Sequence, residues 1–68
     1  MDKALLEYEM KKKNISVLEM CEKLSISRSA FYRKCNEKTQ FTQKEIQTIT
    51  DVLNLDSPVS IFFTKPVS

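Results

Sequence analysis

Four side chains near the middle of the chain are suited to hydrogen bonding with DNA. They are Arg28, Ser29, Tyr32 and Arg33. If residues 28–36 form a helix, Ser29 and Arg33 each lie about 200° around its axis from Phe31. Phe31 then faces the core, while the polar side chains share an outward surface. Such a helix is equipped to enter a DNA groove, where arginine can bond bidentately to guanine O6 and N7.

The local charge supports this interpretation more strongly than the total charge does. The chain has 11 basic and 9 acidic residues, which give a formal net charge of +2 at pH 7. Within residues 28–38, four basic side chains and one acidic side chain leave a local charge of +3. Basic groups concentrated on a short helix are typical of a nucleic-acid-binding surface. A solvated face of mixed charge is the alternative.

The composition argues against enzyme chemistry. The chain has no histidine for acid–base work, and neither a carboxylate pair nor a Gly-rich phosphate cradle is evident. Its two cysteines, Cys21 and Cys35, do not make a zinc site, which normally takes four ligands. We therefore expect no catalytic residues, no metal and no cofactor. Both thiols are expected to be reduced, with Cys21 packed as a small apolar side chain; a disulfide is the alternative.

Capping residues predict an all-α chain of five short helices. Asp2 caps a first helix that ends near Lys13, where Asn14 is a natural stop. Ser16 with Glu19, and Thr42 with Glu45, have the spacing of capping boxes. Ser27 is expected to cap the third helix, and Ser57 the fifth, with Pro58 at its first position. The predicted helices end near positions 13, 24, 36, 54 and 63.

The apolar residues recur at helical spacing and predict one core. Val17, Met20, Cys21 and Leu24 form a stripe on the second helix, and Ile46, Ile49, Val52 and Leu53 form one on the fourth. A chain of 68 residues is expected to be a single domain, 1–68, with a frayed tail at 64–68. No apolar run is long enough for a membrane span, and the N-terminus lacks the features of a secretion signal. We expect a cytoplasmic protein of a bacterial host cell, associated with the nucleoid when bound to DNA.

Residues at the helix junctions resemble those of the phage-repressor helix-turn-helix family. This family includes the Cro and CI proteins of temperate phages and the regulators of the xenobiotic-response-element type. The matching residues are Ile15-Ser16, Ile26-Ser27-Arg28-Ser29, Asn36 and Ile46-x-x-Ile49-x-x-x-Leu53-x-Leu55. The runs Phe-Tyr-Arg-Lys and Phe-Thr-x-Lys-Glu-Ile resemble especially small regulators from phages of Gram-positive bacteria.

The resemblance implies a compact, five-helix, lambda-repressor-like domain with its helix-turn-helix at about residues 16–36. Helix 28–36 would be the recognition helix, with Arg28, Ser29, Tyr32 and Arg33 at base edges or adjacent phosphates. Further contacts with the phosphate backbone are expected from Ser16, Lys34, Asn36, Lys38, Thr39 and Gln40. The alternatives are a surface salt bridge for Arg33, packing at a rim for Tyr32 and solvated charges in the loop.

The implied function is that of a Cro-like phage repressor, binding a palindromic operator in double-stranded DNA as a homodimer. Dimer contacts are expected from Ile61, Phe62 and Phe63, with one phenylalanine in the core and the other partly exposed. A small phage modulator or antirepressor, acting on another phage repressor protein, is the alternative. An antitoxin is a third possibility.

Several positions depart from the family pattern. Many members have glutamine at the first position of the second helix, where it binds a phosphate, but this chain has Val17. Glycine is absent, so Ser25 and Asn36-Glu37 occupy turns in which φ is often positive. Met10 and Cys35 replace a charged pair of several relatives, and we expect them to contact each other.

Overall fold

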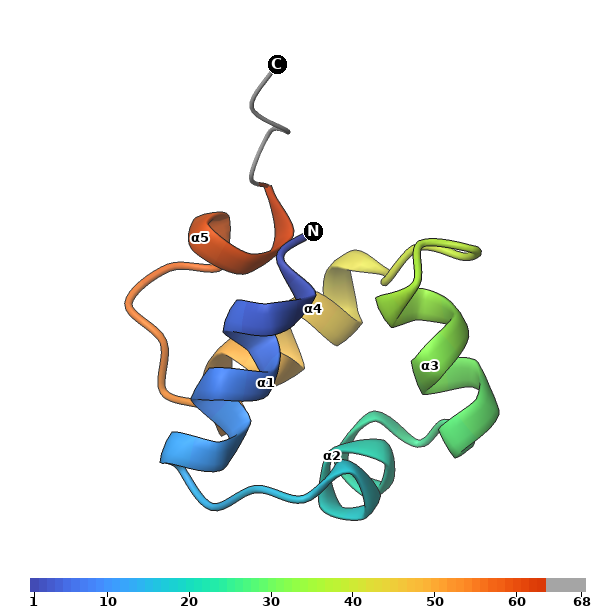
Figure 1. Ribbon diagram of the computed structural model, residues 1–68, viewed down its shortest axis with the longest axis horizontal. Coiled ribbons are helices and arrows are strands. Elements are labelled where there is room, and N and C mark those ends of the chain that lie inside the picture. Colours follow the sequence, from blue (N-terminus) through green and yellow to red (C-terminus); the bar gives the residue numbers. More distant parts are fainter. Residues whose placement is uncertain (64–68) are drawn as a thin grey trace.

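The computed structural model describes residues 1–63 as five α-helices and no strands (Figure 1). The helices are α1 (Lys3–Lys12), α2 (Val17–Leu24), α3 (Arg28–Cys35), α4 (Gln43–Val52) and α5 (Val59–Phe62). The predicted all-α architecture is confirmed. No helix in this part of the chain has the length and apolar character needed to cross a bilayer. The predicted frayed tail, 64–68, lies outside the described residues.

Polar side chains cap the first turns of α1, α2 and α3. The Asp2 carboxylate accepts a hydrogen bond from the Leu5 amide at 3.0 Å. Ser16 Oγ accepts from the Glu19 amide at 3.1 Å, and Ser27 Oγ accepts from the Ala30 amide at the same distance. Each cap satisfies a backbone donor that has no partner within its own helix. The predicted starts of these helices are confirmed.

The two predicted capping boxes differ. At α4 both bonds form, because Thr42 Oγ1 accepts from the Glu45 amide at 3.1 Å and Glu45 Oε1 accepts from the Thr42 amide at 2.8 Å. At α2 only the bond from the Glu19 amide to Ser16 Oγ forms, and the described chain shows no bond from the Ser16 amide to the Glu19 carboxylate. The prediction at α2 is therefore right for the Ser16 cap and wrong for the full capping box.

The start of α5 also differs from the prediction. Pro58 occupies the N-cap position and the helix begins at Val59, one residue later than expected. Ser57 is not the N-cap, although its Oγ accepts a bond from the Val59 amide at 3.2 Å. The shift is small because proline suits either side of a helix start, where its missing N–H costs no helical hydrogen bond.

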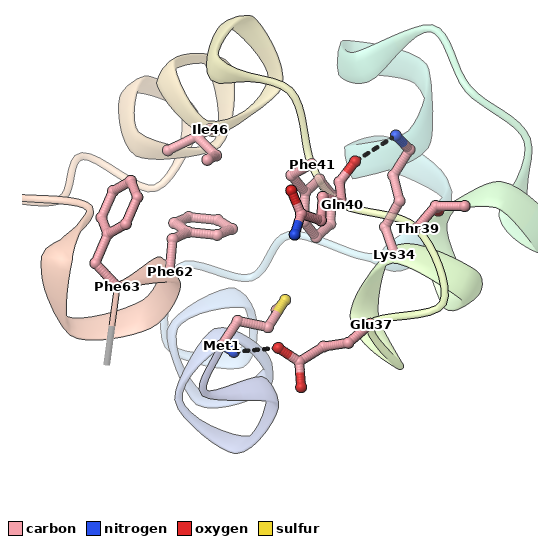
Figure 2. Close-up of a pocket in the computed structure, with 9 residues that line it drawn as sticks. All are labelled: Met1, Lys34, Glu37, Thr39, Gln40, Phe41, Ile46, Phe62 and Phe63. Carbon is pink, nitrogen blue, oxygen red and sulfur yellow. Dashed lines mark hydrogen bonds and ion pairs between the residues drawn. The ribbon is translucent and has the colours of Figure 1, made fainter. Parts of the chain in front are cut away.

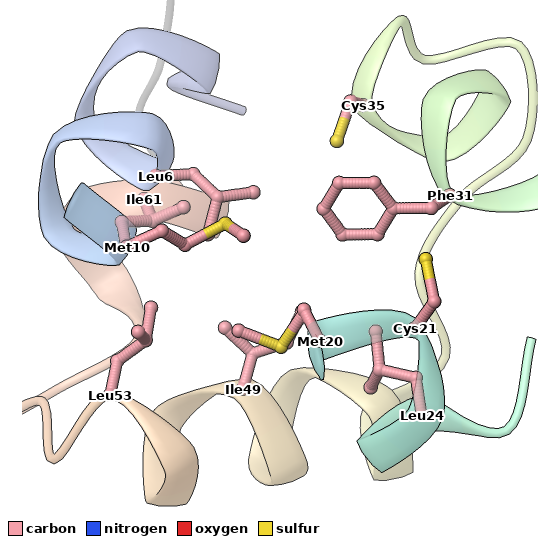
Figure 3. Close-up of a cluster of buried hydrophobic side chains, with 10 residues drawn as sticks. All are labelled: Leu6, Met10, Met20, Cys21, Leu24, Phe31, Cys35, Ile49, Leu53 and Ile61. Carbon is pink, nitrogen blue, oxygen red and sulfur yellow. The ribbon is translucent and has the colours of Figure 1, made fainter. Parts of the chain in front are cut away.

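All five helices contribute to one buried apolar cluster (Figure 3). Its members are Leu6, Met10, Met20, Cys21, Leu24, Phe31, Cys35, Ile49, Leu53 and Ile61. Most of the α2 stripe is buried as predicted, whereas Val17 is half-buried and packs against the cluster. Met10 and Cys35 are both buried in this cluster, and a direct contact between them stays a prediction. Burying a side chain such as Phe31 stabilises the fold by about 1.5–3 kcal/mol.

Four residues other than glycine have positive φ in the described chain: Asn14, Ser25, Glu37 and Asn54. Ser25, with φ 58° and ψ 42°, ends α2 and begins the turn of the helix-turn-helix. Glu37, with φ 62°, follows α3. The expected left-handed conformation is thus found at Ser25 and Glu37, whereas Asn36 has φ −90°. For a residue other than glycine, asparagine or aspartate this conformation costs about 1–2 kcal/mol.

The strain at Ser25 predicts that Ser25→Gly stabilises the protein. Glycine adopts this conformation without strain but loses more freedom on folding, so we expect the free energy of unfolding to rise by about 0.5–1 kcal/mol. Urea unfolding followed by circular dichroism measures the change. Asn14→Gly is the matched control and should give a smaller gain, because asparagine tolerates positive φ. An unchanged or lower stability of Ser25→Gly would contradict the prediction.

Candidate nucleic-acid interface

Helix α3 has one buried face and one exposed face. Phe31 is only 3% exposed, and Cys35, one turn later, is also buried. Arg28, Ser29, Tyr32 and Arg33 are all exposed. Among residues 1–63, neither arginine makes a side-chain hydrogen bond or ion pair, so the alternative of a surface salt bridge for Arg33 is not observed. The predicted separation of the two faces is confirmed, and both guanidinium groups are free to bind a partner.

Tyr32 is held more firmly than its exposed position suggests. Its ring packs edge-on against Phe31, with centroids 6.0 Å apart and planes at 70°. This contact restricts the ring while much of its surface is left open to solvent. An aromatic ring fixed in this way adds little conformational entropy cost on binding.

The first turn of α2 offers fewer polar groups than most such helices. Ser16 is exposed, and its Oγ already accepts the Glu19 amide. Its hydroxyl proton can still be donated, since a hydroxyl has one donor and two acceptor positions. Val17 packs against the core and has no polar side-chain group.

The loop between α3 and α4, residues 36–42, carries the other predicted backbone contacts. Lys38, Thr39 and Gln40 are exposed, as predicted. Asn36 is also exposed, and its Oδ1 accepts a bond from Lys3 Nζ at 3.2 Å. Lys3 thus lies beside the end of α3, a placement that no local sequence signal reveals because the two residues are 33 positions apart.

Lys34 does not belong to the exposed group. Its Nζ donates to the Gln40 carbonyl at 3.2 Å and to Glu45 Oε1 at 3.0 Å, and it lies 5.8 Å from the centroid of the Phe41 ring. The Lys34 side chain is only 15% exposed. The ammonium is already bound within the protein (Figure 2), which argues against the predicted phosphate contact.

The electrostatic environment of Glu45 keeps this ion pair charged. Burial by itself raises the pKa of the carboxyl group. Hydrogen bonds from the Thr42 amide and from Lys34, together with the charge of Lys34, outweigh that effect and lower the pKa below its usual value. Glu45 is thus an anion at neutral pH.

Residues 6–58 match the family model of the Cro/C1-type HTH DNA-binding domain. The chain belongs to this family. The match extends from α1 to Pro58 and includes the whole helix-turn-helix. No curated protein and no solved structure matches the chain. The exposed face of α3 in a Cro/C1-type domain makes the protein a DNA-binding regulator, with DNA as its partner.

In this Cro/C1-type domain the C-terminal apolar residues occupy three different environments. Ile61 is 1% exposed and lies in the core, so its side chain is not on the surface, contrary to the expectation of a dimer contact. Phe62 is half-buried and packs edge-on against Phe41 at 5.6 Å. Phe63 is 55% exposed. The prediction that one phenylalanine is partly exposed is confirmed for Phe63, whereas Phe62 packs against the core without being part of it.

Phe62 and Phe63 line a hollow of about 310 Å³ between α5, α4 and the loop that follows α3 (Figure 2). Phe41 and Ile46 supply further apolar walls. At its edge Glu37 Oε1 accepts a bond from the amino group of Met1 at 2.8 Å. The hollow combines an apolar lining with a charged edge, as surfaces that bind proteins often do.

The two cysteines are free thiols within the core. Burial raises the pKa of Cys35 to about 11; Lys3 lowers it, whereas Glu7 and Cys21 raise it further. Burial also raises the pKa of Cys21, against a smaller lowering by Arg28. Both thiols are therefore protonated at neutral pH and unreactive. The described residues contain no cluster of three or more metal-ligating side chains.

The raised pKa of Cys35 predicts a loss of stability in alkali. The ordinary pKa of a cysteine thiol is 9.0, and that of Cys35 in the folded protein is about 11. At a pH between these two values, the unfolded chain has released the thiol proton and the folded chain has retained it. The free energy of unfolding contributed by this thiol is therefore complete below the first value and is lost as the pH rises towards the second. Urea unfolding of the wild type across this range should show a steeper decline than that of Cys35→Ala. Equal slopes would contradict the prediction.

Proposed function

We propose that this protein is a Cro-like phage repressor that binds a palindromic operator as a homodimer through α3. The observation that carries the proposal is the exposed face of α3, with two unpaired guanidinium groups in a domain of the Cro/C1 type. A single helix of eight residues reads only a few base pairs. Two copies on half-sites about 34–36 Å apart would supply the missing specificity.

In this proposal Arg28, Ser29, Tyr32 and Arg33 contact bases. Either arginine can bond bidentately to a guanine, and each such pair gives about 1–3 kcal/mol of discrimination. Ser29 can donate to or accept from either type of base. Tyr32 can touch a thymine methyl group or bond a phosphate with its hydroxyl.

Contacts with phosphates would come from both sides of α3. On one side lies Ser16 at the start of α2, and on the other lie Asn36, Lys38, Thr39 and Gln40. All are exposed, which supports the assignment. Such contacts set the position of the protein on the duplex without reading its sequence.

The proposed dimer forms through Phe63 and the apolar hollow next to it. Phe63 is 55% exposed, and apolar side chains that gather in one exposed patch can mark a site of protein interaction. Phe62 lines the same hollow and extends the apolar surface.

The second candidate is a modulator that binds another phage repressor protein. Two observations on α2 favour it. Val17 cannot donate a side-chain hydrogen bond to a phosphate, and Leu18 exposes more than half of its surface. This candidate predicts weak DNA binding by the protein alone and tight binding to the repressor encoded next to it.

Arg33→Ala tests the proposed base contact. An operator is first selected from random duplex DNA, and its affinity is then measured by fluorescence anisotropy at several salt concentrations. We expect Arg33→Ala to lose about 1–3 kcal/mol on the operator and less on random DNA, so that the preference between the two falls. Lys11→Ala, an equal loss of charge on α1, should retain the preference. Failure to select any sequence, with tight binding to a neighbouring repressor, would favour the modulator.

Phe63→Ser tests the dimer surface. We expect this variant to bind a full palindrome more weakly than the wild type, because the second copy no longer binds cooperatively, while its affinity for a half-site is unchanged. Val59→Ser is the matched control, since Val59 is 56% exposed on α5, the helix that Phe63 follows, but does not line the hollow. Equal wild-type affinities for palindrome and half-site would contradict cooperative dimer binding.

A further inference from the structure

We propose that Lys34 and Glu45 form a positioning pair, which holds the α3–α4 loop in the conformation that binds the DNA backbone. The inference rests on the proposed function and extends it to two residues that do not themselves touch DNA. Lys34 lies in the last turn of α3 and Glu45 in the first turn of α4. Their 3.0 Å bond therefore joins the helix that precedes the loop to the helix that follows it.

The pair is set into the protein rather than spread on its surface. The side chains of Lys34 and Glu45 are 15% and 14% exposed. Lys34 Nζ lies over the Phe41 ring, 5.8 Å from its centroid, and this ring packs edge-on against Phe31 and Phe62 with centroids 6.1 Å and 5.6 Å apart. Partial burial strengthens the attraction relative to an ion pair in water. It also restricts both side chains, so the pair has a defined geometry.

Lys34 also fixes the orientation of a peptide group in the loop. Its Nζ binds the carbonyl oxygen of Gln40. In a planar trans peptide the carbonyl and the following N–H point in opposite directions, and no cis peptide occurs in the described chain. The amide of Phe41 therefore points away from the Lys34 ammonium.

The loop has backbone donors to offer once it is held in this way. Both of its ends are bonded: the Lys38 amide donates to the Arg33 carbonyl at 2.9 Å, and the Thr42 amide to Glu45. Between them, residues 1–63 provide no hydrogen-bond acceptor for the amides of Thr39, Gln40 and Phe41. Consecutive free amides beside the exposed Lys38 side chain suit an anionic phosphate oxygen.

A direct contact between Lys34 and DNA would be costly. The Lys34 side chain is only 15% exposed, so an ammonium that moved outward to a phosphate would leave its two acceptors, and the Glu45 carboxylate would then be an unpaired, mostly buried anion close to a polyanion. While it stays in place, Lys34 neutralises Glu45. The pair thus removes a repulsive charge and orders the loop at the same time.

The variant Glu45→Gln distinguishes a positioning role of Lys34 from a direct phosphate contact, because the two predict opposite changes in operator affinity. Glutamine retains an acceptor for the Thr42 amide but removes the ion pair. The positioning role predicts weaker binding to the selected operator, by about threefold to tenfold, the range of the net contribution of one ordinary hydrogen bond. A direct phosphate contact by Lys34 predicts tighter binding, because the substitution frees the ammonium and removes a negative charge. Asp51→Asn, the same loss of charge later on α4, is the control and should bind like the wild type.

A double-mutant cycle with Lys34→Met completes the test. Methionine retains the packing on Phe41 but has no charge. If the two residues act as one pair, Lys34→Met and Glu45→Gln each weaken binding and the double variant is little worse than Lys34→Met. Additive effects, or tighter binding by Glu45→Gln, would overturn the inference.

Two further measurements distinguish a positioning role from a purely structural one. Affinities are compared at a temperature at which circular dichroism shows every variant to be folded, and amide chemical shifts of residues 38–41 are recorded for Glu45→Gln. We expect shifts in these amides together with the loss of affinity. If Glu45→Gln lowers the stability but leaves the operator affinity unchanged, the positioning pair is overturned and the proposed function is not. A wild-type protein without any sequence preference would overturn the proposed function and this inference with it.

Discussion

The burial of Phe31 and Cys35 determines which residues α3 can present to a partner. These side chains are one turn apart and both are in the core. Successive helical residues are rotated by about 100°, so burying this pair fixes the rotation of α3 about its axis. Arg28, Ser29 and Arg33 are exposed as a consequence. The same burial makes Cys35 a neutral thiol, so core packing and the absence of thiol chemistry have one cause.

Packing also has to offset the strain at the two ends of α3. A helix of eight residues is not stable alone in water. The turn before it contains Ser25 and the residue two after it is Glu37, both with positive φ and neither a glycine. Each adds a cost of about 1–2 kcal/mol that the buried side chains of α2 and α3 must exceed. Helix α3 is therefore stabilised by its packing against neighbouring helices rather than by its own sequence.

Features encoded over three or four residues could be predicted from the sequence. The caps at Ser16, Ser27 and Thr42 depend on neighbouring residues, and so do the apolar stripes that identify the core. Pairings between distant residues could not be predicted in this way. Lys34 binds Glu45 across 11 positions and Lys3 binds Asn36 across 33. Ile61 illustrates the same limit, since a helix of four residues has too little periodicity to show which of its side chains faces inward.

The long-range pairing of Lys34 changes the electrostatic description of the interface. The sequence gives residues 28–38 four cations and one anion. One of those cations is bonded to Glu45, a residue outside this range, so its charge is cancelled locally. The remaining cations of this range are Arg28, Arg33 and Lys38, and Lys3 adds a further charge at the C-terminal end of α3. In the proposed complex the two arginines read bases and Lys38 binds the backbone, so sequence-independent attraction is modest and specificity depends more heavily on the arginines. A small regulator with such a surface would gain specificity by pairing with a second copy. Each added half-site multiplies the discrimination between operator and random DNA, whereas the affinity for random DNA rises less.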